Sequence, residues 1–158
     1  MLDLFIIVGA KYLVAVPVAG LGLCFWLATP EERRDLALLA AVSLPAAYAL
    51  ARLAGLLYAH PQPFVEWGTE PLIPHEIDNA FPSDHVLLAG TLGAVIALLA
   101  RRFRAFGGAL FCVAALIGLA RVAAGLHSWA DVAVSLALAA GVAGMAFLLI
   151  RRYGAVLR

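Results

Sequence analysis

The chain is organised around the polar stretch Asn79-Ala80-Phe81-Pro82-Ser83-Asp84-His85, which ends a loop and opens an apolar helix. Proline restricts the residue before it to extended conformations, and serine is a good N-cap, so we expect the first helical turn to begin at Asp84. Free backbone N–H groups and the positive end of the helix dipole then favour an anion such as a phosphate group. His85 stands at the same place and can carry a proton. Taken alone, the stretch has a simpler interpretation, in which Ser83 only caps a helix.

The composition predicts that this helix lies in a membrane. Hydrophobic residues make up 65% of the 158 residues, charged residues make up 13%, and the mean hydropathy is +0.99. These values exclude an ordinary soluble domain. A spanning helix needs about 20 mostly apolar residues. We therefore predict an all-α integral membrane bundle, a single domain over residues 1–158, with five spans: Leu4 to Ala28, Leu36 to Tyr58, Ser83 to Ala100, Gly107 to Ala124 and Val132 to Ile150.

The basic residues predict the orientation of these spans, because short cytoplasmic loops are enriched in Lys and Arg. Eight of the eleven follow the first, third or fifth span: Arg33, Arg34, Arg101, Arg102, Arg104, Arg151, Arg152 and Arg158. The N-terminus is then outside and the C-terminus cytoplasmic. The connection from Ala59 to Pro82 is outside as well, and it contains no Lys or Arg.

The other three basic residues, Lys11, Arg52 and Arg121, lie within spans and toward the outer face. From the rise of 1.5 Å per residue, Lys11 lies roughly 10 to 15 Å from the outer end of its helix and Arg52 roughly 9 Å from its own. Cations inside a bilayer are costly, so they commonly mark a site or a buried partner. Snorkelling to the headgroups is the alternative for Lys11 and Arg52. The convergence of all three on one leaflet favours a site.

A second polar stretch joins the fourth and fifth spans on the outer side. Gly125 can end the fourth helix in a left-handed cap, which places Arg121 in its last turn. Ser128 and Asp131 have the spacing of a capping box, so Asp131 has a purely structural interpretation. The same geometry leaves His127 just before the helix, where Asp131 could hold one imidazole nitrogen and leave the other free to attack.

Together the two stretches supply an anion-binding helix start, two histidines, an arginine and a carboxylate on one membrane face. This set suits phosphoryl transfer through a phosphohistidine, which needs a nucleophile, an acid for the leaving oxygen, and cations and N–H groups for the phosphoryl oxygens. Such a mechanism requires no metal and no other cofactor. His75, Glu76 and Asp78 could ligate a divalent ion, but without a convincing fourth ligand we prefer a solvated loop.

The two stretches resemble the motifs of the type-2 phosphatidic acid phosphatase superfamily. The second motif of that family, Pro-Ser-x-His, is matched by residues 82–85. The third motif, Arg, five residues, His, three residues, Asp, is matched by Arg121, His127 and Asp131. The wider run from Pro74 to His85 is most similar to the bacitracin-resistance branch, the undecaprenyl-diphosphate phosphatases.

The resemblance implies a role for each matched residue. His127 would attack phosphorus, Asp131 would orient His127, and His85 would protonate the leaving phosphate oxygen. The groups that would hold the phosphoryl oxygens are the amides at the helix start and the residues Ser83, Asp84 and Arg121.

The chain departs from the family at the first motif, which ends in Arg-Pro after a lysine seven residues earlier. Here Gln62 stands at the arginine position and Gly55 at the lysine position. Glutamine donates hydrogen bonds to a phosphoryl oxygen but brings no charge and no bidentate fork. We expect Lys11 and Arg52 to offset the loss, so that these two cations and Gln62 complete the phosphate-binding set.

By resemblance, we expect a phosphatase that converts undecaprenyl diphosphate to undecaprenyl phosphate for recycling of the cell-wall lipid carrier. Its site would face the outside of a bacterial plasma membrane. Its partners would be the polyprenyl diphosphate and the bilayer, with no nucleic acid. Two alternatives remain: another enzyme of the same fold, either a lipid phosphatase of the phosphatidylglycerophosphate or lipid A type or a phosphotransferase, and a catalytically weak protein that binds lipid phosphates. Turnover that depends on His127 would separate an enzyme from a binding protein.

Overall fold

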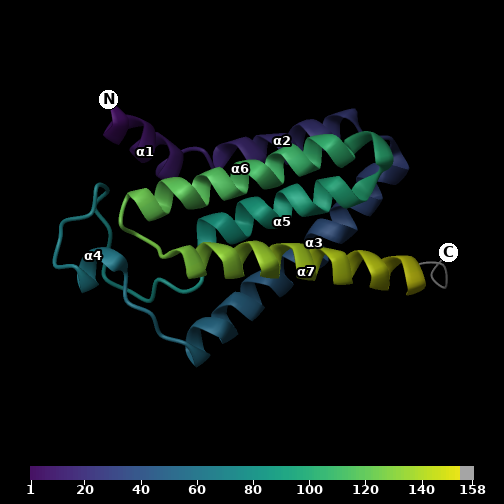
Figure 1. Cartoon of the computed structure of the whole chain (residues 1–158). Coiled ribbons are helices and arrows are strands. Elements are labelled where there is room, and N and C mark those ends of the chain that lie inside the picture. The colour runs from purple at the N-terminus through teal and green to yellow at the C-terminus, as the bar shows by residue number, and fades with distance from the viewer. Residues whose placement is uncertain (154–158) are drawn as a thin grey trace.

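The structure, a computed structural model, describes residues 1–153, and these residues form a helical bundle (Figure 1). The helices in chain order are α1 (Leu2–Lys11), α2 (Ala15–Leu27), α3 (Pro30–Leu57), α4 (Pro63–Glu66), α5 (Asp84–Leu99), the 3₁₀ helix η1 (Arg101–Phe103), α6 (Arg104–Ala123) and α7 (Trp129–Tyr153). Within the described range, the β-structure is limited to one isolated bridge between Pro61 and Asn79. The predicted all-α fold is therefore confirmed.

Helix α5 lies at the centre of the bundle, where it packs on α6, α7 and α3 (Figure 1). Helix α7 shows what drives this packing, since it buries the small residues Ser135, Ala139 and Ala143 and exposes Leu148 and Leu149. Lipid tails are as apolar as leucine, so helices in a bilayer associate through small residues that permit close approach. The large apolar side chains are left to face the lipid.

The number of membrane-capable helices is smaller than the five predicted spans. Helices α3 and α7 and the segment Arg101–Ala123 are long and apolar enough to cross a membrane. Helices α1 and α2 qualify only as a pair, which is bent by 48° at the break between them. Helix α5 is apolar but has 16 residues, which is about 24 Å of helix. Residues 1–153 thus contain three such helices, or four with the bent pair, and a fifth span through α5 stays a prediction.

The second span is longer than predicted because polar residues extend its helix. Thr29 and Glu32 form a capping box that satisfies N–H groups of the first turn, so α3 already begins at Pro30. The prediction placed the start at Leu36 because it followed only the apolar run.

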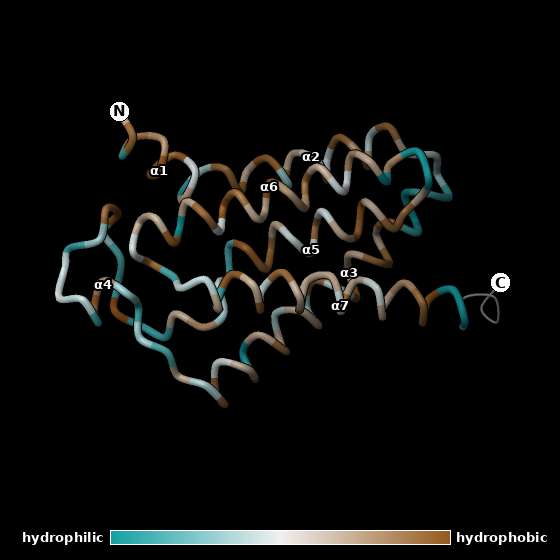
Figure 2. The backbone as a smooth tube through the Cα atoms, viewed as in Figure 1, coloured by the Kyte–Doolittle hydropathy of each residue, from teal (hydrophilic) through white to brown (hydrophobic). Residues whose placement is uncertain are grey.

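Polar residues gather at the two ends of the bundle, and the middle is apolar (Figure 2). The N-terminus, the loop between α3 and α5, and the α6–α7 connection lie at one end, which we call the loop end (Figure 1). The α2–α3 and α5–α6 connections and the end of α7 lie at the opposite end, together with seven of the eight basic residues that predict the cytoplasmic side. The eighth, Arg158, lies outside the described residues.

Candidate active site

The side chain of Asn79 fixes the end of the loop that precedes α5. Its Nδ2 donates to the carbonyl oxygens of Gly55 at 2.9 Å and Tyr58 at 3.3 Å, at the end of α3. The last carbonyls of a helix have no partner within the helix, so Asn79 satisfies two of them. Its Oδ1 accepts hydrogen bonds from the N–H groups of His60 at 2.9 Å and Phe81 at 3.1 Å.

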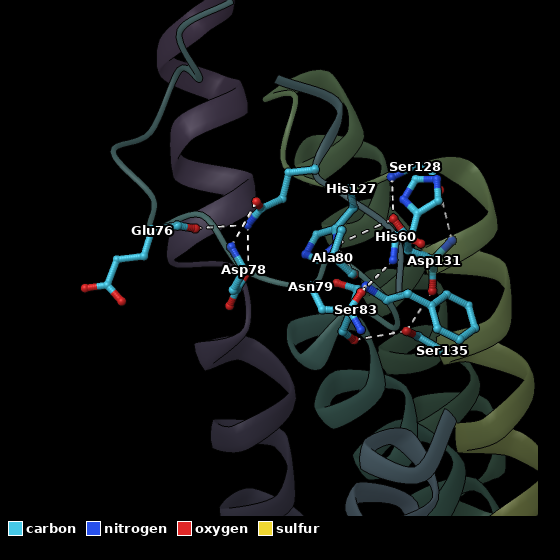
Figure 3. Close-up of polar contacts among 12 residues, drawn as sticks. His60, Glu76, Asp78, Asn79, Ala80, Ser83, His127, Ser128, Asp131 and Ser135 are labelled. Atoms are coloured by element: carbon cyan, nitrogen blue, oxygen red, sulfur yellow. Dashed lines mark hydrogen bonds and ion pairs between the residues drawn. The ribbon is translucent and has the colours of Figure 1, made fainter. Parts of the chain in front are cut away.

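Gln62 fixes the preceding part of the loop. Its side chain is 1% exposed, and its Nε2 donates to the Glu76 carbonyl oxygen at 3.0 Å and to the Asp78 carboxylate at 2.6 Å. Its Oε1 accepts the Asp78 N–H at 3.1 Å (Figure 3). Both ends of the amide are thus engaged by the loop. The phosphate contact expected of Gln62 stays a prediction, while the contacts observed give this residue a structural role.

Gly55, at the position of the family's lysine, is a point of close approach between the loop and α3. A Cβ on Gly55 would lie 2.9 Å from the Phe81 carbonyl oxygen and 3.3 Å from Asn79 Nδ2. The first distance is too short for a real contact, so any side chain at this position would displace the loop. Gly55 therefore permits the loop to approach α3 closely, while Gln62 holds the same loop through contacts within it.

His127 lies on the α6–α7 connection and is 6% exposed. Its Nδ1 is 2.9 Å from the carbonyl oxygen of Ala80, and the Ala80 N–H donates to the His60 carbonyl oxygen at 2.8 Å. A carbonyl only accepts, so this contact assigns the proton to Nδ1 and leaves Nε2 as the nitrogen with a free lone pair. The sequence did not predict this partner of His127, because any residue type can supply a backbone carbonyl.

Asp131, at the start of α7, serves both the helix and the histidine. Its Oδ2 accepts the Ser128 N–H at 2.6 Å, and Ser128 Oγ accepts the Asp131 N–H at 3.3 Å, so the capping box is present. The same Oδ2 lies 3.8 Å from His127 Nδ1, which is an ion-pair distance and longer than a hydrogen bond. Its Oδ1 is buried and has no hydrogen-bond partner among residues 1–153. Ala80 thus supplies the hydrogen bond to His127, and Asp131 supplies a nearby negative charge.

Ser83 precedes α5 as predicted, but its hydroxyl makes no capping hydrogen bond. The Oγ atom is buried and unpartnered within the described part of the chain. The buried Ser135 of α7 lies with its Oγ 3.0 Å from the Ser83 carbonyl oxygen and 2.8 Å from that of Asp131 (Figure 3). Ser135 therefore joins the starts of α5 and α7. The free Ser83 hydroxyl, next to the open N–H groups of a helix start, suits a phosphoryl oxygen.

Arg121 lies in the last turn of α6 and is 4% exposed. Its Nη1 donates to the carbonyl oxygen of Ala10 in α1 at 3.3 Å, while its Nε is buried and has no partner within residues 1–153. A guanidinium with a buried, unused donor is suited to bind an anion. The predicted left-handed cap is also confirmed, since Gly125 has a φ of 76°.

His85 is half-buried in the first turn of α5. Arg121, His127, Asp84 and His75 lie close enough to its ring to interact with it electrostatically. The two predicted catalytic histidines and the predicted arginine therefore share one site, although they come from α5, α6 and the α6–α7 connection.

His75 joins this group, which the sequence did not predict. Desolvation of its ring and then the positive charge of Arg121 lower the pKa of His75, and Asp78 partly opposes them. Sequence reasoning considered His75 only as a weak metal ligand. Among residues 1–153, no three His, Cys, Asp or Glu side chains are grouped so that they could hold a metal ion.

The two remaining predicted cations are more exposed than Arg121. Arg52 forms an ion pair with Asp84, and its guanidinium lies 5.0 Å from the centre of the Tyr48 ring. Lys11 is exposed, with its Nζ 5.4 Å from the centre of the Tyr12 ring. A groove of about 480 Å³ runs beside Arg52, and its other lining residues are Ala51, Gly55, Leu56, Asn79 and Phe81.

Known proteins resemble this chain over most of its length. Residues 19–154 match the family model of the PAP2 superfamily. The chain is 34% identical over 126 residues to the bacitracin transport permease protein BcrC of Bacillus licheniformis, a match that covers 78% of this chain and 60% of the relative. It is 37% identical over 117 residues to the undecaprenyl-diphosphatase BcrC of Bacillus subtilis (strain 168), with coverages of 74% and 59%. The chain thus spans about three fifths of the length of these relatives.

One solved structure has the same fold. The crystal structure of Aquifex aeolicus LpxE matches with a TM-score of 0.69 and 23% sequence identity, over 92% of this chain and 84% of that one.

Proposed function

Because this chain belongs to the PAP2 superfamily, the type-2 phosphatidic acid phosphatases, we propose that it is a membrane phosphatase acting on a lipid-linked diphosphate. The substrate we propose is undecaprenyl diphosphate, which the name of the Bacillus subtilis relative specifies for that protein. One observation carries the proposal: a histidine with a fixed proton on Nδ1, the buried Nε of Arg121 and the unpartnered hydroxyl of Ser83 occur at the same end of the bundle.

The reaction proceeds in two displacements at one site. In the first, His127 Nε2 forms a bond to the terminal phosphorus, and the bond from phosphorus to the bridging oxygen breaks. His85 gives a proton to that oxygen as the lipid monophosphate leaves. In the second, water attacks the phosphohistidine, His85 takes a proton from the water, and inorganic phosphate is released while His127 is regenerated.

The surroundings of His127 favour this attack. The Ala80 carbonyl holds the Nδ1 proton, so in the neutral ring Nε2 is the nitrogen with the free lone pair, and its direction is fixed. The imidazole becomes positively charged as it attacks, and the Asp131 carboxylate at 3.8 Å stabilises that charge. Ser83 Oγ, Arg121 Nε and the N–H groups at the start of α5, with Asp84 first among them, bind the phosphoryl oxygens.

The two exposed cations, Arg52 and Lys11, bind the second phosphate of the substrate. Arg52 exchanges its partner Asp84 for the lipid-proximal phosphate, and Lys11 adds positive charge from the side of α1. Gln62 contributes by holding the loop, through Glu76 and Asp78.

The chain is a multi-pass membrane protein, and we place its loop end at the outer face of a bacterial plasma membrane, with five spans and a single domain. The basic residues at the opposite end support this orientation. Cysteines introduced singly by Glu70→Cys and Arg101→Cys, in a chain without Cys112, give the test in intact cells. An impermeant thiol reagent should label the first and spare the second, and labelling of the second alone would invert the orientation.

The reaction is tested with purified protein and three substrates: undecaprenyl diphosphate, phosphatidylglycerophosphate and the lipid A diphosphate. We expect phosphate release to be fastest from undecaprenyl diphosphate, with a covalent phosphoryl label on the protein. His127→Ala should remove the label and the turnover together, by more than about 10³-fold. Full turnover in His127→Ala would exclude the phosphohistidine. Faster phosphate release from another lipid would support the phosphatase reaction but assign a different substrate.

A further inference from the structure

The basic end of the bundle contains arginines in two different situations. Arg33 donates to the carbonyl oxygens of Phe25 and Trp26, and Arg102 binds Glu32 and the Leu27 carbonyl. These two guanidiniums join α2, α3 and η1, so their charge serves the fold. Within residues 1–153, the other arginines at this end are not used in this way.

Four of the remaining arginines line a cavity at this end of the bundle. The cavity has a volume of about 650 Å³, and Arg34, Arg101, Arg104 and Arg151 lie around it with the single carboxylate of Asp35. Within residues 1–153, no ion pair holds Arg34, Arg101 or Arg104. The cavity lining therefore has three more positive than negative charges. Several guanidiniums around one space repel one another unless an anion lies between them.

The rest of the lining is apolar and comes from three helices. Leu39 of α3, Leu98 of α5 and Phe147 of α7 are among its side chains. The volume falls within the usual range for small-molecule sites, roughly 300 to 1,000 Å³. A small soluble anion would satisfy the arginines and leave these apolar walls in contact with water. A ligand that is anionic at one end and apolar at the other would satisfy both.

We propose that this cavity binds the headgroup of an anionic phospholipid, with the phosphate among Arg34, Arg101 and Arg104 and the start of the acyl chains against Leu39, Leu98 and Phe147. The position suits such a ligand, since basic pockets between helices at a membrane surface recognise lipid phosphates. The four arginines lie at the end of the bundle opposite His127, so this lipid is not the substrate. The lipid would act as a structural partner that neutralises the cavity and joins α3, α5, α6 and α7.

Lipid binding is measured by native mass spectrometry on the purified chain in a nonionic detergent. Short-chain phosphatidylglycerol and phosphatidylcholine are the probes, because they differ in headgroup charge and neither has a terminal phosphate that a phosphatase could remove. We expect phosphatidylglycerol to bind more tightly. Each arginine near a membrane surface contributes a factor of about five to lipid affinity. Arg101→Gln should therefore weaken phosphatidylglycerol binding about fivefold, and Arg34→Gln/Arg101→Gln about 25-fold.

The matched control is Arg152→Gln, which removes the same charge from the same end, because Arg152 is exposed and does not line the cavity. It should leave lipid binding unchanged. Thermal unfolding in detergent with phosphatidylcholine should be equal for all variants, and Arg101→Lys should retain part of the affinity. Inorganic phosphate at the lipid concentration should not displace the bound lipid.

Three results would overturn the proposal: equal binding of the two lipids, equal loss in Arg152→Gln, or displacement by inorganic phosphate. The first two would show that the cavity has no lipid preference of its own, and the third would identify a site for a soluble anion. None of these results bears on the phosphatase reaction, because the readout is binding without turnover.

Discussion

The candidate site at the loop end and the arginine-lined cavity at the basic end hold their charged groups in opposite ways. At the loop end, Arg121 and Asp131 are buried, and backbone carbonyl and N–H groups fix them in place. At the basic end, Arg34, Arg101 and Arg104 are exposed. Buried charges are costly and therefore need exact partners, whereas exposed charges act mainly through their sum. Chemistry at the loop end should thus depend on single residues, and binding at the basic end on how many cations remain.

Loss of the proposed acid at the loop end should slow the reaction strongly. His85→Gln should lower kcat by about 10²- to 10⁴-fold, toward the lower figure because the phosphate leaving group is already acidic. Substrate binding should change little, since the phosphoryl ligands remain. Steady-state kinetics of phosphate release would measure both parameters. An equal loss with a substrate whose leaving group needs no proton would show that His85 is not the acid.

A pair of arginine substitutions compares the two ends directly. Arg121→Gln should lower kcat/KM by about 10²- to 10³-fold, because it removes a buried, charge-assisted donor to the transition state. Arg101→Gln should change kcat/KM by less than about twofold, because an exposed charge far from the site is screened. Comparable losses in the two variants, with equal thermal stability, would contradict the distinction between the ends.

A smaller effect should follow from disturbing the frame that holds the nucleophile. Gln62→Glu replaces the nitrogen that donates to Asp78 with an oxygen of nearly the same position, so two carboxylates face each other. The resulting shift of the loop should move the Ala80 carbonyl and lower kcat by about tenfold while KM changes less.

The second substitution Asp78→Asn provides the control for this frame. It restores a donor opposite Glu at position 62 and should recover part of the lost kcat. A double variant no better than Gln62→Glu alone would show that the Gln62–Asp78 contact does not position His127. A rise in KM with kcat unchanged would favour the phosphate contact first predicted for Gln62.

The smallest effect concerns pH and His75. Its pKa in the folded chain is lowered from 6.5, first by desolvation and then by Arg121, so the folded chain binds fewer protons than the unfolded chain near that pH. The free energy of unfolding is therefore not reduced by His75 above that pH, and it decreases as the pH falls through that value. His75→Gln should lose less thermal stability than the parent between about pH 7.5 and about pH 5.5. Glu70→Gln is a control from the same loop, and parallel curves for the parent and His75→Gln would contradict the lowered pKa of His75.

The sequence predicted the elements that depend on residue type and spacing. The match to the PAP2 superfamily and the BcrC relatives confirms the family assigned from residues 82–85 and the third motif. Gly125 and the capping box at Ser128 were also predictable, because they are local. The Ala80 carbonyl and the place of Ser135 were not, since each contact joins residues about 50 positions apart. The role of Gln62 was obscured because its residue type suits a phosphate contact and a loop contact equally well.

Gly93 and Gly107 lie far from the candidate active site, and they permit the close approach of α5 and α6. A Cβ on Gly107 would lie 2.1 Å from the backbone nitrogen of Ala97, and one on Gly93 would lie 2.6 Å from that of Phe111. A single methyl group at either position would force α5 and α6 apart, and these two helices carry His85 and Arg121. Gly93 lies about 12 Å from His85 along α5, and Gly107 lies about 21 Å from Arg121 along α6. A relative that keeps every motif residue could therefore be inactive because of a larger residue at position 93 or 107. A comparison of the reactive side chains alone would not detect that cause.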